Sequence, residues 1–435
     1  MLAVALAIVA PIHWYLWKRL VKDTTRTRRA RRVGTALVVL LALSIPATQA
    51  LSRVLPYSWQ ALVAWPGFLW LALMFYLLVT LAILEIPRLA LVLWRRRSRS
   101  TAAGSEDSTE NRNAGLASHE VADKSDVPGN STVGRSAGNS AQASGKTAVA
   151  TIEPAAPADE RFDAGRRLLL GRSLAATAGV LSASTVGVGV FQAMAAPDLK
   201  RVPIQLPKLP ASMNGFRIAL VSDIHLGPLL GRGHTERIVR MINSVDADLV
   251  AIVGDLVDGS VAQLGAAAEP LQDLRARHGS FFVTGNHEYF SDYQEWVDEV
   301  NSLGVRVLRN ERVDVQGLDL AGVNDLNGTA VGDGPDFGKA LDGRDAARPV
   351  VLLAHQPVQA HEAARHGVDL QLSGHTHGGQ MVPFNLLVGL QQPVVAGLGN
   401  VDGTQVYVTR GAGFWGPPVR FGAPPDISVI ELNGA

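Results

Sequence analysis

The sequence predicts a group of membrane-spanning helices followed by a layered α/β domain. Two observations predict this order. The first 99 residues contain long apolar runs bounded by clusters of arginine and lysine, which is the pattern of transmembrane helices. From Val202 onward, short β-rich runs alternate with amphipathic helical stretches, which is the pattern of an α/β domain.

The composition narrows the chemistry that this chain can perform. Of the 435 residues, 47% are hydrophobic, a share that fits a chain partly embedded in lipid. The formal net charge is +1, so no nucleic-acid partner is expected, and we predict no protein partner. Because there is no cysteine, thiolate zinc sites and cysteine nucleophiles are excluded. Any metal must be held by His, Asp, Glu or Asn.

Residues 1–99 are predicted to form a membrane region with about three transmembrane helices. Met1 to Trp17 is almost uninterrupted apolar sequence, and the basic run Lys18 to Arg32 follows it. Val33 to Leu51 is a second apolar run, and a third begins near Ala61. A second basic cluster then ends this region. Because basic clusters stay in the cytoplasm, both clusters indicate that the first span runs from outside to inside.

Two further segments precede the α/β domain. Residues 100–165 are rich in Ala, Ser, Gly and Thr and poor in aromatic residues, which predicts a disordered cytoplasmic linker. Residues 166–197 place three arginines before a moderately apolar run. This indicates a twin-arginine-like export signal or a fourth transmembrane helix, with a buried helix of a soluble domain as the alternative. Either of the first two would carry residues 198–435 to the extracytoplasmic side.

Polar side chains follow five predicted strands of the domain, at the point where each strand ends. The apolar runs read FRIALVS, LVAIV, FFVT, VVLLA and VDLQL. The side chains that follow them are Asp223, His225, Asp255, Asp258, Asn286, His287, His355, His375 and His377. Open α/β sheets bind ligands at the carboxyl ends of their strands. We therefore expect these side chains to meet at one site.

Each of these residues alone has a structural explanation, because an Asp can cap a helix, an Asn can serve a turn and a His can be satisfied in the core. Together they are harder to explain without a ligand. Carboxylates crowded into a partly buried site are destabilised by roughly several kcal/mol unless cations neutralise them. The mixed oxygen and imidazole donors suit two divalent ions such as Mn, Fe or Zn.

The motif order DxH, GDxxD, GNHE, H and GHxH resembles the calcineurin-like metallophosphoesterases. The resemblance extends from Leu206 to the C-terminus, and GHTHGGQ and GFWGPPVRFGAPP are similar to segments of the bacterial membrane-anchored subgroup. It implies a four-layer α/β/β/α sandwich that hydrolyses phosphoesters with two metals. The implied ligands are Asp223, His225 and His377 for one metal and Asn286, His355 and His375 for the other, with Asp255 bridging both.

The charges of two such cations then imply a mechanism. Cations about 3.5 to 4 Å apart lower the pKa of a shared water from about 15.7 towards 7, and the bridging hydroxide attacks phosphorus in line. His287 is predicted to stabilise the transition state or protonate the leaving oxygen, and Asp258 to hold its imidazole. Arg410 and Arg420 are candidate substrate-binding residues, with structural pairing to carboxylates as the alternative. The loop Gly322–Gly334 is expected to cover the site.

We therefore expect a multi-pass protein of the cell membrane whose catalytic domain hydrolyses phosphodiesters of lipid or envelope material on the extracytoplasmic side. A phosphomonoesterase is equally compatible with the metal site. A receptor or scaffold that only binds a partner is a non-catalytic alternative. A third alternative is that the membrane region is a transporter to which the hydrolytic domain is attached. Glu85 is then the candidate charged residue within the membrane.

Overall fold

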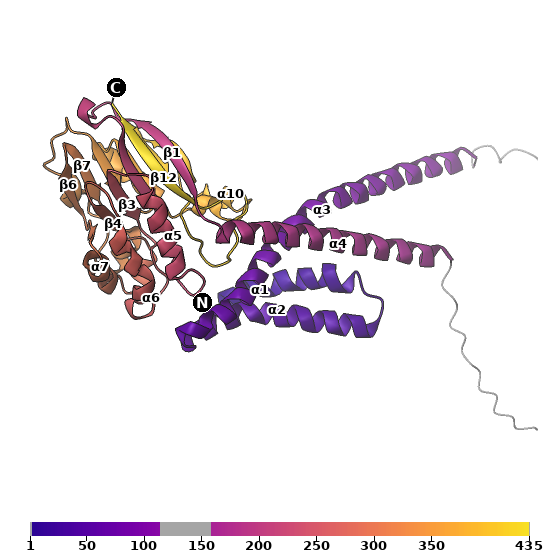
Figure 1. Cartoon of the computed structure of the whole chain (residues 1–435). Helices are drawn as coiled ribbons and strands as arrows, with labels where there is room; N and C mark the ends of the chain where they lie inside the picture. The colour runs from indigo at the N-terminus through magenta and orange to yellow at the C-terminus, as the bar shows by residue number, and fades with distance from the viewer. Residues whose placement is uncertain (1, 114–157, 435) are drawn as a thin grey trace, which may run out of the picture. The chain divides into compact units, whose positions relative to one another are not determined.

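A computed structural model describes residues 2–113 and 158–434 of the chain. Most of the predicted linker, residues 114–157, lies outside the described residues. The chain divides into two compact units, of which the first contains the whole α/β domain (Figure 1). The units are Met1–Thr80 with Ala175–Ala435, and Leu81–Leu174.

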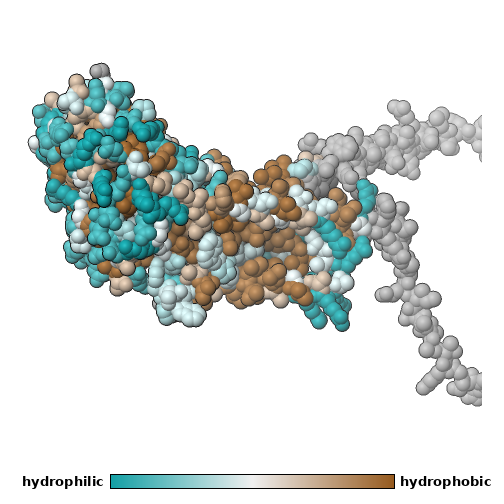
Figure 2. Space-filling model, in the orientation of Figure 1, coloured by the Kyte–Doolittle hydropathy of each residue, from teal (hydrophilic) through white to brown (hydrophobic). Residues whose placement is uncertain are grey.

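The N-terminal part of the chain is helical. Its elements are α1 (Leu2–Leu16), the π-helix η1 (Trp17–Lys22), α2 (Arg28–Val54), α3 (Tyr57–Asn113) and α4 (Ala158–Met194). Three stretches among the described residues are long and apolar enough to cross a membrane, namely Arg28–Ser52, Tyr57–Pro87 and Gly165–Met194. On the face shown in Figure 2, hydrophobic side chains gather over these helices, whereas the α/β domain is mostly hydrophilic.

These three stretches coincide with the second and third predicted spans and with residues 166–197. The first predicted span falls on α1, which has 15 residues. That is shorter than the roughly 20 residues that a bilayer-spanning helix requires. A span at Met1 to Trp17 therefore stays a prediction.

The first sheet of the α/β domain has six strands in the order β1-β12-β2-β3-β4-β5. The strands are β1 (Asp198–Gln205), β2 (Phe216–Val221), β3 (Leu249–Val253), β4 (Ser280–Val283), β5 (Val305–Val307) and β12 (Asp426–Asn433). β2 to β5 pair in parallel, and β12 runs antiparallel to β2. Every residue of β3 is buried, as expected of a parallel strand covered on both faces.

The second sheet also has six strands, in the order β10-β11-β9-β8-β7-β6. They are β6 (Glu311–Val315), β7 (Leu318–Gly322), β8 (Val350–Leu353), β9 (Leu370–Ser373), β10 (Gly397–Val401) and β11 (Thr404–Val408). The four central strands are parallel, and the outer pairs β6·β7 and β10·β11 are antiparallel. Both sheets are therefore mixed, with parallel centres.

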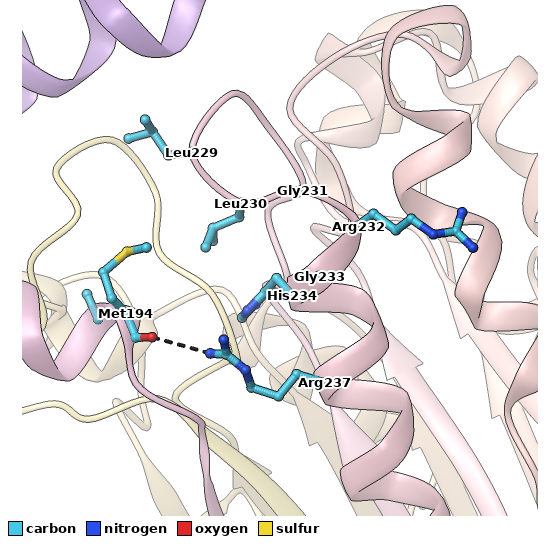
Figure 3. A pocket seen from close by; sticks show the side chains of 9 residues that line it. Met194, Leu229, Leu230, Gly231, Arg232, Gly233, His234 and Arg237 are labelled. Atoms are coloured by element: carbon cyan, nitrogen blue, oxygen red, sulfur yellow. Dashed lines mark hydrogen bonds between the residues drawn. The ribbon is translucent and has the colours of Figure 1, made fainter. Parts of the chain in front are cut away.

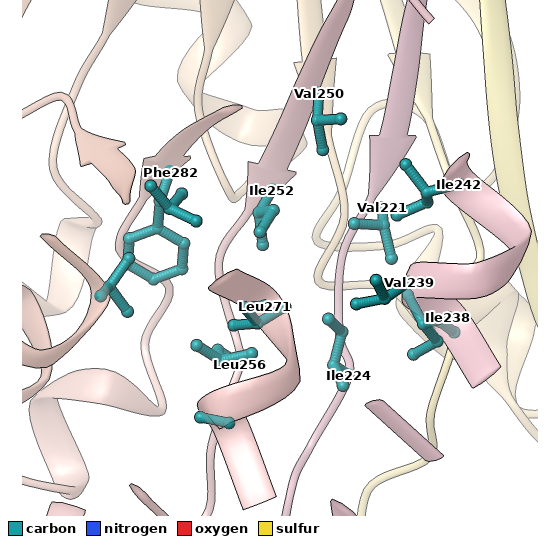
Figure 4. Close-up of a cluster of buried hydrophobic side chains, with 14 of the residues drawn as sticks. Val221, Ile224, Ile238, Val239, Ile242, Val250, Ile252, Leu256, Leu271 and Phe282 are labelled. Atoms are coloured by element: carbon teal, nitrogen blue, oxygen red, sulfur yellow. The ribbon is translucent and has the colours of Figure 1, made fainter. Parts of the chain in front are cut away.

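Helices cover the outer face of each sheet. Against the first sheet lie α5 (Arg232–Asn243), α6 (Val261–Ala268) and α7 (Tyr293–Ser302), and against the second lie α8 (Phe337–Leu341) and α9 (Ala360–Arg365). Figure 4 shows Ile238 of α5 near Ile224 and Val239, in the cluster that joins the helices to the first sheet. α5 buries residues spaced three to four apart along one face, which explains its helical form.

A separate apolar cluster fills the space between the two sheets, with Leu220 of β2 and Leu353 of β8 among its members. The layers therefore run helix, sheet, sheet, helix, which confirms the predicted four-layer sandwich. The remaining short helices are η2 (Ala211–Met213), η3 (Glu269–Asp273), η4 (Glu288–Phe290), η5 (Leu326–Val331), η6 (Pro357–Gln359), η7 (His377–Gly379) and α10 (Asn385–Val388).

Candidate metal centre

The loops after β2, β3, β4, β8 and β9 bring the predicted metal ligands together. Three groups of ligand atoms form, and within each group the atoms lie within 4.8 Å of one another. The groups are Asp223, His225 and His377; His225, Asp255 and His287; and Asp255, His355 and His375. Because His225 and Asp255 each belong to two groups, the three groups make one continuous site.

The backbone at this site adopts conformations that are unusual for residues with side chains. Asp223, His225, Asp255, His375 and His377 have φ angles of 52°, 50°, 52°, 71° and 51°. Left-handed φ at non-glycine residues costs about 1–3 kcal/mol each, and such residues concentrate at functional sites. The sharp turns direct the side chains of neighbouring strand ends towards one region.

Two motif glycines let the loops approach the ligand carboxylates. A Cβ atom on Gly374 would lie 2.3 Å from Asp223 Oδ2, and one on Gly285 would lie 2.3 Å from Asp255 Oδ1. Contacts below 3.0 Å require the neighbouring atoms to move. The glycines of GHTH and GNHE are therefore required by close packing against the two carboxylates.

The first group converges on a single point. His225 Nε2 lies 3.0 Å from His377 Nε2, and His377 Nε2 lies 3.3 Å from Asp223 Oδ1. Burial, together with the positive charge of Arg420, lowers the pKa of His377 well below its usual value. Two imidazole nitrogens and a buried carboxylate oxygen at this separation match the donor set of a metal site.

The third group, which contains Asp255, His355 and His375, is oriented by a backbone carbonyl. His355 Nδ1 lies 2.8 Å from the carbonyl oxygen of Val253, which can only accept a hydrogen bond. The Nδ1 atom therefore carries a proton, and in the neutral ring Nε2 has a free lone pair. That Nε2 lies 3.1 Å from Asp255 Oδ2 and 3.1 Å from Asn286 Oδ1. His375 Nδ1 lies 2.9 Å from the same Asn286 oxygen.

The electrostatics of the site favour a positive charge. Burial raises the pKa of Asp223, and the neighbouring Asp255 charge raises it further. Burial would lower the pKa of His355, but the charges of Asp255, Asp223 and Asp325 raise it well above its usual value. The crowded carboxylates thus favour the protonated form of the buried His355 imidazole. A metal cation beside these carboxylates would stabilise them in the same way.

Asp258 lies between two histidines. Its Oδ1 is 2.5 Å from His287 Nδ1, and its Oδ2 is 3.1 Å from His225 Nδ1. Burial would lower the pKa of His287, but the hydrogen bond that its Nδ1–H donates to Asp258 and the charge of Asp255 raise it to about 9. His287 Nε2, the nitrogen away from Asp258, lies 3.9 Å from Asp255 Oδ2.

Glu288 is a site residue whose role the sequence pattern does not predict. Its buried carboxylate accepts hydrogen bonds from the backbone N–H groups of Asp255 at 3.0 Å, Leu256 at 2.8 Å and Gly285 at 2.6 Å. Burial and the charge of Asp255 raise the pKa of Glu288 to about 7. The side chain joins the loops after β3 and β4, and its only signal in the sequence is the fourth letter of GNHE.

The two arginines proposed for substrate binding differ in position. Arg420 is fully buried, its Nε donates to the Gly413 carbonyl at 2.9 Å, and its Nη1 donates to the His377 carbonyl at 2.8 Å. A guanidinium enclosed by backbone carbonyls offers little surface to a phosphate, which favours the structural alternative for Arg420. Arg410 is partly exposed beside Gly378, and its role in phosphate binding stays a prediction.

Aromatic rings flank His287. The ring centroid of Phe290 lies 5.7 Å from that of His287, and the centroid of Trp415 lies 5.8 Å away. Both rings are exposed, at 70% for Phe290 and 58% for Trp415. The predicted covering loop is tied to the same region, since Tyr289 donates a hydrogen bond to Asp333 Oδ2 at 2.9 Å.

A cavity of about 280 Å³ lies outside the metal centre, between the end of α4 and the start of α5. Figure 3 shows Met194, Leu230, His234 and Arg237 around it. Arg237 donates a hydrogen bond to the Met194 carbonyl at 3.3 Å. None of the predicted site residues lines this cavity.

Comparisons with known proteins agree with the geometry. The family model for calcineurin-like phosphoesterase matches residues 216–379. The chain is 41% identical over 270 residues to a transmembrane protein with metallophosphoesterase domain from Danio rerio, covering 59% of this chain and 62% of that protein. It is 42% identical over 247 residues to an uncharacterized metallophosphoesterase from Helicobacter pylori, covering 56% of this chain and 66% of that protein.

These matches cover less than two thirds of the length of both relatives. A shorter relative is covered almost completely. An uncharacterized metallophosphoesterase from Aquifex aeolicus is 34% identical over 241 residues, which are 54% of this chain and 92% of that protein. With its four-layer fold and its buried His and Asp groups, the chain belongs to the calcineurin-like metallophosphoesterase family.

Proposed function

We propose that this chain is a phosphodiesterase that is anchored in the membrane and acts on lipid or cell-envelope phosphoesters. Within its family we place it in the bacterial membrane-anchored subgroup. The observation that carries the proposal is the convergence of the three groups of ligand atoms at the strand ends. The apolar helices support the membrane anchor. The proposed location of the domain on the extracytoplasmic side rests on the basic clusters that flank the spans.

The donor set fits two divalent cations. Asp255 lies between the two sets of ligands, with its Oδ2 3.8 Å from His225 Nε2 and 3.1 Å from His355 Nε2. Asp223, His225 and His377 would hold one cation, and Asn286, His355 and His375 would hold the other. When bound, two such cations supply an activated water and neutralise the phosphoryl oxygens. Mn, Fe and Zn all accept this mixture of oxygen and nitrogen donors.

His287 is the proposed proton donor. The hydrogen bond that its Nδ1–H donates to Asp258 raises the pKa of His287, which favours the protonated imidazole. Asp258 fixes the ring through Nδ1 at 2.5 Å, which directs the Nε2 proton away from Asp258. In either class of phosphoester the departing alkoxide needs a proton, which a positioned acid at His287 can supply.

The exposed rings of Phe290 and Trp415 beside His287 support a diester. They offer an apolar surface on which the second substituent of the phosphate, such as an acyl-bearing group, can lie. A phosphomonoester has no second substituent to use this surface. The membrane anchor supports a substrate close to the bilayer.

The substrate is tested with the full chain reconstituted in lipid vesicles and loaded with Mn. Phosphodiester lipids, soluble nucleotides, a chromogenic diester and the matching monoester are compared, each with and without chelator. We expect chelator-sensitive cleavage of the diesters and faster turnover of the lipid than of the nucleotides. Activity on nucleotides without activity on lipid phosphoesters would contradict the proposed substrate class.

The orientation needs a separate test. Protease added to intact cells should digest the α/β domain of an epitope-tagged chain, while a cytoplasmic marker protein stays intact. Digestion only after the cells are permeabilised would place the domain in the cytoplasm and contradict this part of the proposal.

A further inference from the structure

An exposed apolar surface follows directly after the last two metal ligands. Phe384, Leu386, Leu387 and Leu390 are 45%, 70%, 59% and 83% exposed. We call these four residues the α10 surface, because they lie in and beside that helix. The chain has no Asp, Glu, Lys or Arg between Gly378 and Val401. Four large apolar side chains within seven residues, without a nearby charge in sequence, differ from the single exposed hydrophobic residues that are normal on protein surfaces.

The α10 surface begins where the α/β domain contacts the apolar helices. The ring of Phe384 packs edge-on against Phe75 with 6.4 Å between centroids, and Phe421 packs in the same way against Tyr76 at 5.8 Å. Phe75 and Tyr76 belong to the candidate span Tyr57–Pro87. The partner of Phe384 is therefore a residue of a helix that is long and apolar enough to cross the membrane.

A second contact joins the domain to another of the candidate spans. The Arg420 N–H donates to the carbonyl oxygen of Gly189 at 2.9 Å. Gly189 lies in the candidate span Gly165–Met194. A Cβ atom on Gly189 would lie 2.4 Å from Val419 Cγ1, so the helix and the domain approach each other closely here.

The α10 surface is also tightly connected to the metal ligands. A Cβ atom on Gly379 would lie 2.4 Å from Asn385 Cα, so η7, which contains His377, packs directly against the start of α10. The segment cannot move far without moving this loop. Whatever the α10 surface touches is therefore held near the metal centre.

We propose that the α10 surface lies in the interfacial layer of the bilayer that the helices cross. Aliphatic side chains next to a transmembrane helix are stabilised when they insert at the boundary between lipid headgroups and acyl chains. Because this stretch carries no charged residue, inserting it does not require burying an ion. The contact of Phe384 with Phe75 favours lipid over a soluble partner, because such a partner would have to reach a residue of the spanning helix. This contact holds the metal centre close to the lipid headgroups, whether or not lipids are the substrate.

The absence of cysteine provides a direct test. A single Leu387→Cys variant of the full chain is labelled with an environment-sensitive fluorophore and reconstituted in vesicles. We expect blue-shifted emission that falls by at least about twofold when the lipids carry bromine on shallow acyl positions. Val331→Cys is the matched control, because Val331 is also 59% exposed but lies in η5. Its emission is expected to stay that of a label in water.

Leu390→Cys serves as a second labelling site in case Leu387→Cys does not fold. Equal responses of the α10 and Val331 labels would overturn the proposal. Blue-shifted emission that brominated lipids do not quench would also overturn it, since it would mean that a second copy or another protein covers the surface. Neither readout requires catalytic activity, so the result does not depend on the proposed hydrolysis.

Discussion

At the scale of single residues, His287 and Asp258 separate metal binding from proton transfer. His287 lies near Asp255, but its Nδ1 is held by Asp258 at 2.5 Å. The ligands of the two proposed cations are complete without it. A variant at this position therefore distinguishes a proton donor from a metal ligand.

His287→Ala is expected to lower kcat by about 10²–10⁴-fold, because a positioned general acid contributes that much. Metal content, measured by elemental analysis, is expected to stay at the wild-type level. His361→Ala is the control, since the His361 side chain is 50% exposed and pairs with Asp402. Loss of both metals in His287→Ala would show that its role is ligation.

A variant of Arg420 distinguishes support of the metal ligands from substrate binding. Because its guanidinium holds the carbonyl groups of His377 and Gly413, Arg420→Lys is expected to weaken metal binding by about 10–100-fold, as for other residues that orient ligands. At saturating metal, KM for the chromogenic diester should be unchanged. An increase in KM with unchanged metal affinity would restore the substrate-binding role.

His234, beside the cavity of Figure 3, predicts a pH dependence of stability. Burial and the charge of Arg237 lower the pKa of His234 to about 4, and its Nε2 has no hydrogen-bond partner among the described residues. In the unfolded chain His234 therefore becomes protonated near pH 6.5. In the folded chain it becomes protonated only near pH 4. Stability is lost as the pH falls through this window, by at most about 3 kcal/mol.

His234→Gln removes this titration. Thermal melts of the detergent-solubilised chain from pH 7 to pH 4 should show a smaller fall in Tm for the variant than for the wild type. Parallel curves for the two proteins would contradict the assigned burial of His234.

At the scale of elements, the strand-end loops need glycines because they pack against carboxylates. Gly374→Ala places a methyl group 2.0 Å from Ser222 Oγ and 2.3 Å from Asp223 Oδ2. We expect the loop to shift and kcat/KM to fall by about 100-fold, the typical effect of a displacement near 1 Å. Gly233→Ala in α5 is the control, because no atom lies within 4 Å of its added Cβ. Wild-type kinetics in Gly374→Ala would contradict the close packing.

The elements also show what the sequence could predict. LVAIV coincides with β3, and the predicted Phe281–Thr284 strand is shifted by one residue from β4. These runs are recognisable because both faces of a central parallel strand are buried, so the apolar pattern is continuous. The residues that follow them in the sequence reach the site because parallel strands end at the same edge.

The roles of Glu288, Arg420 and the α10 surface could not be predicted in this way. Glu288 and Arg420 are charged residues whose burial depends on backbone groups up to 43 positions away. A sequence pattern treats charged side chains as exposed and does not show such partners. The α10 surface looks like core sequence, and only the fold shows that it faces outward.

At the scale of the whole molecule, the fold combines a buried cluster of His and Asp with helices long enough to cross a membrane. The proposed two-metal phosphodiesterase explains why the carboxylates can be buried together. The membrane helices and the α10 surface together would keep this chemistry at a lipid surface.

The most direct test of the two-metal claim is a titration of the metal-free full chain with Mn from zero to two equivalents, with hydrolysis of the chromogenic diester measured at each step. If both cations are needed, activity rises mainly with the second equivalent and chelator abolishes it. Hydrolysis that is unaffected by chelator, or no hydrolysis of either ester with two metals bound, would contradict it.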